Sequence, residues 1–175
     1  MAAALTVAII LPAVVVASWP VATTSSWISQ GWHTYHRADD IAADPGTPVV
    51  PIRSGRVVFA GWKSNCGGVQ VWISHGNGLY SAYYHLRSES VTKGQLVTAQ
   101  VTRIGRVGSS GCASGPHVHV EVWRGFPWRS GSYRVKPWGF IDSGSFLPSR
   151  SAVLKKLAFS TIRHCSVAGS PLSIF

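Results

Sequence analysis

His117-Val118-His119-Val120-Glu121 is the stretch of this 175-residue chain that says most about its fold and its chemistry. Successive side chains of a β-strand point to opposite faces. A strand here places His117, His119 and Glu121 on one face, about 7 Å apart at each step. The valines between them face the other way and predict a buried side. The open side would carry two imidazoles and a carboxylate.

The histidine pair has two interpretations. A His-X-His pair on a strand can supply two metal ligands, or one ligand beside one catalytic base. It can equally be two solvent-exposed strand histidines. The loops that precede it, residues 108–111 and 114–116, consist mostly of glycine, serine and proline. Such loops turn the chain sharply into a strand and leave room above it, which favours a site.

A second group of ligand-type side chains lies upstream, in His36-Arg37-Ala38-Asp39-Asp40. Zinc sites in hydrolases usually take three protein ligands from His, Asp and Glu and leave a fourth position for water. His36, Asp40 and one imidazole of the downstream pair would make such a set. Taken alone, the segment could be only a polar turn before a strand.

A third candidate segment is Tyr83-Tyr84-His85-Leu86, an aromatic run that ends in a histidine. It follows Asn77-Gly78, a strong hairpin signal. Residues 69–74 alternate between apolar and polar side chains, and no long helical period occurs before residue 150. Further short apolar runs punctuated by Gly and Pro occur at 57–59, 79–84, 101–107 and 118–123. The sequence therefore predicts a mainly β domain with little helix.

Four blocks of the chain resemble, in order and spacing, the lysostaphin-type zinc endopeptidases, which cut peptidoglycan cross-links. The blocks cover roughly residues 36–123 and are the HxxxD block 36–40, the segments 46–49 and 54–58, the block 83–86, and the block 115–121. The resemblance implies a small antiparallel β-sheet core with a groove across one sheet.

The same resemblance implies a role for each candidate residue. The zinc ligands would be His36, Asp40 and His119, and the catalytic histidines would be His85 and His117. Which of the two histidines is the base stays open. Glu121, where the family usually has a glutamate, is expected to support a ligand from behind rather than to bind zinc.

The chain departs from the family pattern around its first block. Ala38 and Asp39 stand where the family usually has glycine and an apolar residue. Asp39 could compete with Asp40 as a ligand, although the four-residue spacing from the first histidine favours Asp40. The segment 26–35 is short and lacks the arginine often found in the family's leading turn, and His33 within it is expected to lie on the surface.

The chain is expected to have three parts: a signal peptide or N-terminal anchor at 1–22, the metallopeptidase domain at 23–149, and a basic tail at 150–175. Residues 1–17 carry no charge and end like an A-x-A cleavage site. The competing interpretation is an uncleaved membrane anchor. Prolines and a serine interrupt the apolar run, which makes it marginal for a span of about 20 residues. Either way the domain would lie outside the cytoplasm. The tail is either a short basic amphipathic helix or an appendage.

Two of the three cysteines, Cys66 and Cys112, lie in glycine-rich loops beside the candidate site. An exported chain can keep a disulfide. A bridge between them would close a loop of about 46 residues, stabilise the fold by roughly 2–4 kcal/mol and hold the loop that presents His117. Zinc ligation by these cysteines is the alternative, and Cys165 would be left as a free thiol.

The chain has sixteen basic and six acidic residues and a formal charge of +10. In a protein of the cell wall this charge would attract anionic wall polymers. Nucleic-acid binding is the other familiar cause of a basic composition. The basic residues are scattered and form no nucleic-acid-binding motif, which disfavours that alternative.

Together these features predict a secreted zinc metalloendopeptidase that hydrolyses peptide cross-links of bacterial peptidoglycan. Zinc would lower the pKa of a water molecule, and one histidine would take its proton. The alternatives are a catalytically silent relative that binds the wall or activates an amidase, a zinc D,D-carboxypeptidase, and a glycosidase. The complete set of five site residues disfavours a silent relative. The adjacent histidine pair disfavours the carboxypeptidase, and the scarcity of acidic residues disfavours the glycosidase. A glycine bridge and a D-alanyl cross-link both remain open as the bond cut.

Overall fold

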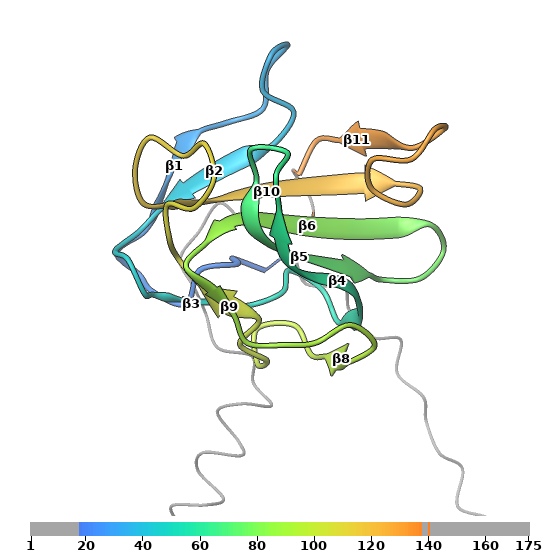
Figure 1. The fold of residues 1–175 in the computed structure, drawn as a ribbon, viewed down its shortest axis with the longest axis horizontal. Coiled ribbons are helices and arrows are strands. Elements are labelled where there is room, and N and C mark those ends of the chain that lie inside the picture. The colour runs from blue at the N-terminus through green and yellow to red at the C-terminus, as the bar shows by residue number, and fades with distance from the viewer. Residues whose placement is uncertain (1–17, 138–139, 141–175) are drawn as a thin grey trace, which may run out of the picture.

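The computed structural model describes residues 18–137 and residue 140. This part of the chain forms eleven strands and no helix (Figure 1). The strands are β1 (Trp27–Gln30), β2 (Asp39–Ala42), β3 (Pro48–Val49), β4 (Gly55–Lys63), β5 (Gly68–Ser74), β6 (Leu79–Leu86), β7 (Ser88–Glu89), β8 (Leu96–Val97), β9 (Gly105–Arg106), β10 (His117–Arg124) and β11 (Tyr133–Val135). The prediction of a mainly β fold is confirmed.

Three of the sequence-based predictions lie wholly or partly outside the described residues. They concern the apolar segment 1–17, the basic tail 150–175 and the free thiol of Cys165. Across 18–137 and 140, no helix is long and apolar enough to cross a membrane.

One antiparallel sheet carries most of the strands, in the order β1-β2-β10-β6-β5-β4-β8. Strand β10 lies in its middle (Figure 1). Strand β6 pairs with one edge of β10, while the other edge pairs with β2 over its first half and with β11 over its second half. The short strands β3, β9 and β7 form a separate antiparallel sheet.

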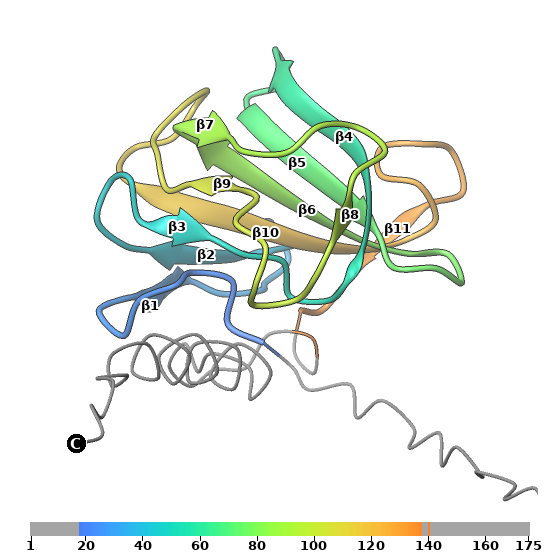
Figure 2. The same cartoon turned by 90° about the horizontal axis from the view of Figure 1, so that it is seen from below.

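One face of the large sheet is the main hydrophobic core. Val118, Val120 and Val122 of β10 have no exposed surface there, as the alternating pattern predicts. Apolar residues from the short strands and their flanks join the same core: Val49, Ile104 and Val107. Figure 2 shows the short strands β3, β7 and β9 to one side of the long strands. Each fully buried valine contributes about 1.5–3 kcal/mol.

The opposite face of the sheet is divided. At one end an aromatic cluster forms from Trp72, Ala82, Tyr84 and Trp123. At the other end, residues of the same face of β10 are polar and include His117 and His119. The main core thus fixes the orientation of β10, and the polar face follows from it because the side chains alternate.

Strand β6 breaks the alternation at one residue. Tyr83 and Leu86 both lie in the main core, so the two residues between them share the other face. The break occurs at His85, whose φ is 60°. Non-glycine residues with positive φ are uncommon and often occur where a side chain must be aimed. This turn of the backbone lets Tyr84 and His85 both face the polar side.

Residues 18–22 pack onto the domain. Trp19 is 2% exposed and Val21 is completely buried in the main core. The backbone N–H of Ala22 donates to the Pro48 carbonyl at 2.9 Å. Cleavage after Ala17 would leave this segment in place, whereas cleavage after residue 22, the expected end of the N-terminal part, would remove it. The position of cleavage stays a prediction.

Replacing Trp19 by Ala should destabilise the domain strongly. The change deletes a buried indole and its 2.7 Å hydrogen bond to Ser26 Oγ, and truncating a buried tryptophan costs about 3–5 kcal/mol. Urea denaturation gives the free energy of unfolding. The matched control is Trp62→Ala, because Trp62 is 62% exposed and its loss should change stability by no more than about 0.5 kcal/mol. Equal effects of the two variants would contradict the packing of the N-terminal segment.

Candidate metal centre

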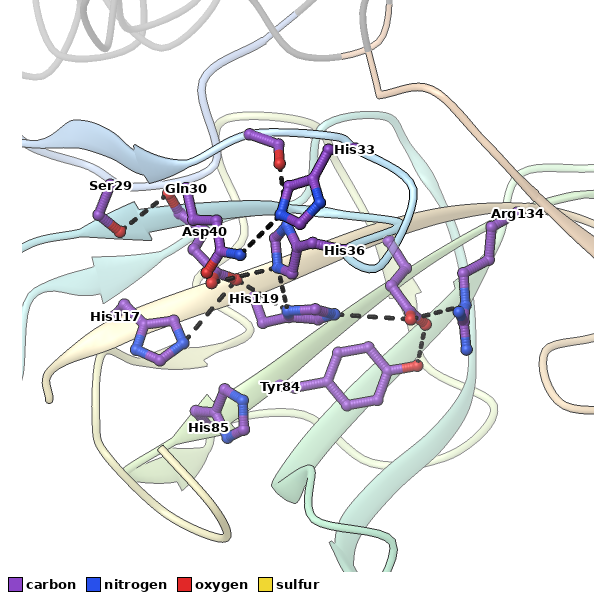
Figure 3. Close-up of polar contacts among 12 residues, drawn as sticks. Ser29, Gln30, His33, His36, Asp40, Tyr84, His85, His117, His119 and Arg134 are labelled. Carbon is purple, nitrogen blue, oxygen red and sulfur yellow. Dashed lines mark hydrogen bonds and ion pairs between the residues drawn. The ribbon is translucent and has the colours of Figure 1, made fainter. Parts of the chain in front are cut away.

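Two neighbouring strands and the turn before one of them bring three ligand-type side chains together. His119 on β10 is the register partner of Asp40 on β2, so their side chains are neighbours on one face. His119 Nδ1 lies 2.7 Å from Asp40 Oδ1. His36, in the turn before β2, places Nε2 3.2 Å from Asp40 Oδ2 and 3.3 Å from His119 Nδ1 (Figure 3).

These three side chains form a donor set that fits a zinc ion. One donor atom from each of His36, Asp40 and His119 lies within 4.8 Å of the other two. Atoms that share a tetrahedral zinc at about 2.0–2.1 Å are roughly 3.3 Å apart, close to the separations seen here. Two imidazoles and one carboxylate are also the ligand types of hydrolytic zinc sites.

The remaining ring nitrogens of the two histidines have partners of their own. His36 Nδ1 donates to the Gly31 carbonyl at 3.0 Å, which leaves Nε2 for the cluster. His119 Nε2 lies 3.5 Å from Glu121 Oε1, while Nδ1 faces Asp40. Such outer contacts fix the ring orientation and raise the basicity of a ligand.

Glu121 is 3% exposed and is held by three groups besides His119. The Tyr84 hydroxyl and Trp123 Nε1 both donate to its Oε2, the latter at 2.8 Å. Arg134 Nε lies 2.8 Å from its Oε1. These contacts engage both carboxylate oxygens, so Glu121 sits behind His119 rather than in the donor set.

Asp39, the competing acid, lies on the other side of β2. Its register partner is Val120, which faces the main core. Asp39 is 3% exposed, and burial raises the pKa of its carboxyl group above the usual value. Asp40, as favoured by the spacing, is the acid that the fold brings to His36 and His119.

The charges of Asp40 and His119 stabilise each other. Burial by itself raises the pKa of the Asp40 carboxyl group, but the hydrogen bond and charge of His119 and the charges of two further histidines outweigh it, so that the pKa is lowered. Burial by itself lowers the pKa of the His119 imidazole, but Asp40 and Glu121 outweigh this effect and raise it to about 9. The Asp40 carboxyl group is therefore held in its ionised form and the His119 imidazole in its protonated form, so a metal ion would have to displace the proton on His119 Nδ1.

His117 and His85 flank the donor set on its open side (Figure 3). Their ring centroids are 4.8 Å apart, and His117 Nε2 lies 3.8 Å from Asp40 Oδ1. His117 Nδ1 donates to the Gly115 carbonyl and His85 Nδ1 to the Ser110 carbonyl, each at 2.8 Å. In a neutral ring this leaves the lone pair on Nε2, where it can accept a proton.

The environment of His85 keeps it neutral. Burial is the largest effect that lowers the pKa of its imidazole, and the nearby His117 and His119 lower it further. A neutral imidazole beside a metal centre is suited to act as a general base.

The structure joins Cys66 and Cys112 in a disulfide, with a Cα–Cα distance of 4.8 Å. The adjoining residues hold His85: the Gly67 carbonyl accepts the His85 backbone N–H at 2.9 Å, and the Ser110 carbonyl accepts from its ring. The bridge therefore fastens the two loops on which His85 depends, besides the loop before His117. Bridged cysteines are not available as zinc ligands.

An open hollow of about 230 Å³ lies over this face of the sheet, where a groove was expected. Its lining consists of Tyr35, His36, Arg37, Asn65, Cys66, Gly67, Tyr84, His85, His119, Glu121, Trp128 and Arg134.

His33 is exposed and hydrogen-bonds Gln30 at 2.9 Å, as expected of a surface residue.

Sequence reasoning missed three members of the site. Tyr84 and Arg134 hold Glu121, and Trp128 Nε1 donates to the Tyr84 hydroxyl at 3.0 Å. Tyr84 lies beside the candidate His85 and could have been suspected. Nothing in the local sequence marks Arg134, because only the pairing of β11 with β10 brings it to Glu121.

A family model described as peptidase family M23 matches residues 34–134. The chain is 41% identical over 92 residues to the DD-carboxypeptidase/endopeptidase Mpg of Neisseria meningitidis serogroup B, an alignment covering 51% of this chain and 21% of that protein. It is 40% identical over 93 residues to the peptidoglycan DD-endopeptidase ShyA of Vibrio cholerae, covering 53% and 21%. It thus spans about a fifth of the length of these curated relatives.

Solved structures share the fold. The catalytic domain of the antimicrobial peptidase lysostaphin from Staphylococcus simulans superposes with a TM-score of 0.54 at 30% identity, covering 70% of this chain and 88% of that one. The catalytic domain of the prophage-encoded M23 protein EnpA from Enterococcus faecalis gives 0.55 at 31% identity, covering 67% and 89%.

Removal of the disulfide should loosen the site as well as the fold. For Cys66→Ser/Cys112→Ser, the free energy of unfolding should fall by roughly 2–4 kcal/mol, as measured by urea denaturation. Cys165→Ser is the control and should leave stability unchanged, since that thiol is expected to be free. Mass mapping of unreduced digests should find Cys66 linked to Cys112; alkylation of both thiols in exported protein would show the pairing to be wrong.

Proposed function

The chain belongs to peptidase family M23, and on that premise we propose that it is a zinc metalloendopeptidase that hydrolyses peptide cross-links of peptidoglycan. The convergence of His36, Asp40 and His119 with two further histidines over one groove carries the proposal. The names of the relatives, a DD-carboxypeptidase/endopeptidase and a peptidoglycan DD-endopeptidase, support the substrate class.

His36 Nε2, an Asp40 carboxylate oxygen and His119 Nδ1 would hold the zinc ion. When bound, zinc polarises a scissile carbonyl and lowers the pKa of a water molecule towards neutrality. Glu121 keeps His119 in place by facing its Nε2, and Arg134 and Tyr84 keep Glu121 in place. Both histidine ligands thus present a defined nitrogen to the cluster.

His85 and His117 would move the protons. The backbone carbonyls that bind their Nδ1 atoms leave both Nε2 atoms free; His85 lines the groove, and His117 Nε2 lies 3.8 Å from Asp40 Oδ1. One imidazole, in its neutral form, would take the proton of the attacking water on Nε2 and pass it to the leaving amine. The other, protonated on Nε2, would donate to the carbonyl oxygen as negative charge develops there. The rings are 4.8 Å apart, so both can reach a peptide bond bound beside the donor set.

We infer that the domain works outside the cytoplasm, in the cell envelope or after secretion, where its substrate lies. The apolar segment 1–17 would direct export or anchor the chain, and residues 150–175 would form a separate basic tail. The charge of +10 would hold the protein near anionic wall polymers. A catalytically silent role finds no support, because none of the five site residues has been replaced.

The function can be tested on purified sacculi. The protein should bind about one zinc ion per chain and should release peptides with new amino termini rather than reducing sugars. A chelator should abolish the activity, and zinc should restore it. Undiminished lysis in excess chelator would refute the metallopeptidase proposal. Identification of the new amino termini on walls with and without glycine bridges would give the bond cut.

The two histidines of β10 should respond differently to replacement by Ala. His119→Ala removes a ligand, so zinc content and the thermal stability that depends on zinc should both fall. His117→Ala leaves the donor set intact, so zinc should stay bound while turnover falls by roughly 10²–10⁴-fold. His85→Ala should behave like His117→Ala, and His36→Ala like His119→Ala. Loss of zinc from His117→Ala but not from His119→Ala would exchange the two roles.

A further inference from the structure

A second hollow, of about 290 Å³, lies beside the groove and has no role in the proposed reaction. Its lining is Trp32, Arg37, Trp123, Ser132, Tyr133 and Arg134. The two arginines line the groove as well, so the two hollows are neighbours that share them. A group bound in the second hollow would therefore lie close to a peptide in the groove.

Aromatic rings flank both arginines, and only Arg134 also pairs with an acid. The Arg37 guanidinium lies 5.1 Å from the centroid of the Trp32 ring, and no ion pair in the described part of the chain involves it. The Arg134 guanidinium lies 4.8 Å from the Trp123 ring and 4.5 Å from the Trp128 ring. Its ion pair with Glu121 uses Nε. Within residues 18–137 and 140, no hydrogen bond or ion pair uses the terminal nitrogens of either arginine.

We propose that this second hollow binds a carboxylate of the substrate peptide through Arg37 and Arg134. The inference rests on the proposed function and specifies its substrate: a peptide with a carboxylate away from the bond that is cut. A guanidinium offers a planar pair of donors that matches a carboxylate. The neighbouring Trp rings lie 4.5–5.1 Å from the two guanidinium carbons, within the range of cation–π attraction, which holds both groups beside the hollow.

The lining presents two positive charges to a ligand. Both guanidinium groups can only donate, whereas the hydroxyls of Ser132 and Tyr133 can also accept. No acid lines this hollow, and Glu121, which pairs with Arg134 Nε, lines the groove instead, so Arg37 has no acidic partner there.

The position of the hollow sets how far the carboxylate lies from the cut bond. Arg134 Nε lies 2.8 Å from Glu121 Oε1, and the same oxygen lies 3.5 Å from His119 Nε2. The guanidinium group is therefore close to the donor set. An extended peptide advances about 3.3–3.6 Å per residue, so the carboxylate belongs within roughly two or three residues of the scissile bond.

The test compares two forms of one substrate. The probe is the cross-linked stem peptide released from sacculi, in its native form and after its carboxylates have been converted to amides. Equilibrium affinity and the steady-state constants are measured for the wild-type protein, for Arg37→Gln and for the control Arg103→Gln. Arg103 is exposed, hydrogen-bonds Ser90, and lines neither hollow. Zinc content is measured for each variant because Arg37 adjoins His36.

We expect amidation to weaken the binding of wild-type protein and Arg103→Gln about tenfold, the effect of losing one charged hydrogen bond. The same change should raise KM and leave kcat nearly unaltered. Arg37→Gln should bind the native peptide about as weakly as the wild-type protein binds the amide, should be nearly insensitive to amidation, and should keep its zinc.

Equal wild-type affinity for the two forms would overturn the proposal, as would an Arg37→Gln variant that keeps the full effect of amidation. Inorganic phosphate and a free carboxylic acid are also compared as competitors of the native peptide. If phosphate displaces the peptide equally well, the hollow is a general anion site and the carboxylate assignment is refuted. Equilibrium affinity is measured separately from cleavage. If the protein cleaves neither form of the peptide, the proposed function is refuted, and the binding data still decide the inference.

Discussion

The register in which β10 pairs with β2 is the constraint on which the candidate site depends. It sets His119 opposite Asp40, so that a histidine and a carboxylate 79 positions apart in the chain meet at 2.7 Å. A slip of β10 by one residue would turn its histidines to the core and expose its valines. Three fully buried valines on the other face of β10 oppose that slip. The hydrophobic core thus holds the polar cluster in place without touching it.

Around this register the polar side chains support one another in layers. Asp40 and His119 share a charge-assisted hydrogen bond, Glu121 faces the far side of His119, and Arg134 with Tyr84 engages Glu121. Buried charges are stable only when each has a partner. The same arginine also forms the edge of the second hollow. If the two proposals hold, Arg134 serves both substrate binding and the orientation of His119, and a change there would affect both.

The catalytic side of the site depends on loops rather than on strand pairing. His85 needs a left-handed backbone conformation, with φ of 60°, to face the groove. Such a conformation persists only where its surroundings enforce it. The Gly67 and Ser110 carbonyls bind its backbone and its ring, and the Cys66–Cys112 disulfide fastens the loops that carry them. Glycine is required at 111, where a Cβ atom would collide with the Cys66 carbonyl.

The sequence by itself determined what is local. Alternation separated the valines of β10 from its histidines, because it follows directly from strand geometry. The resemblance to the family's HxxxD block favoured Asp40 over Asp39. The tertiary structure decided what depends on distant partners: the packing of Trp19 into the core, the turn at His85, and the contact of Arg134 with Glu121. Short-range patterns carry no information about which strand lies beside which. The second hollow could therefore be found only once β11 was seen beside β10.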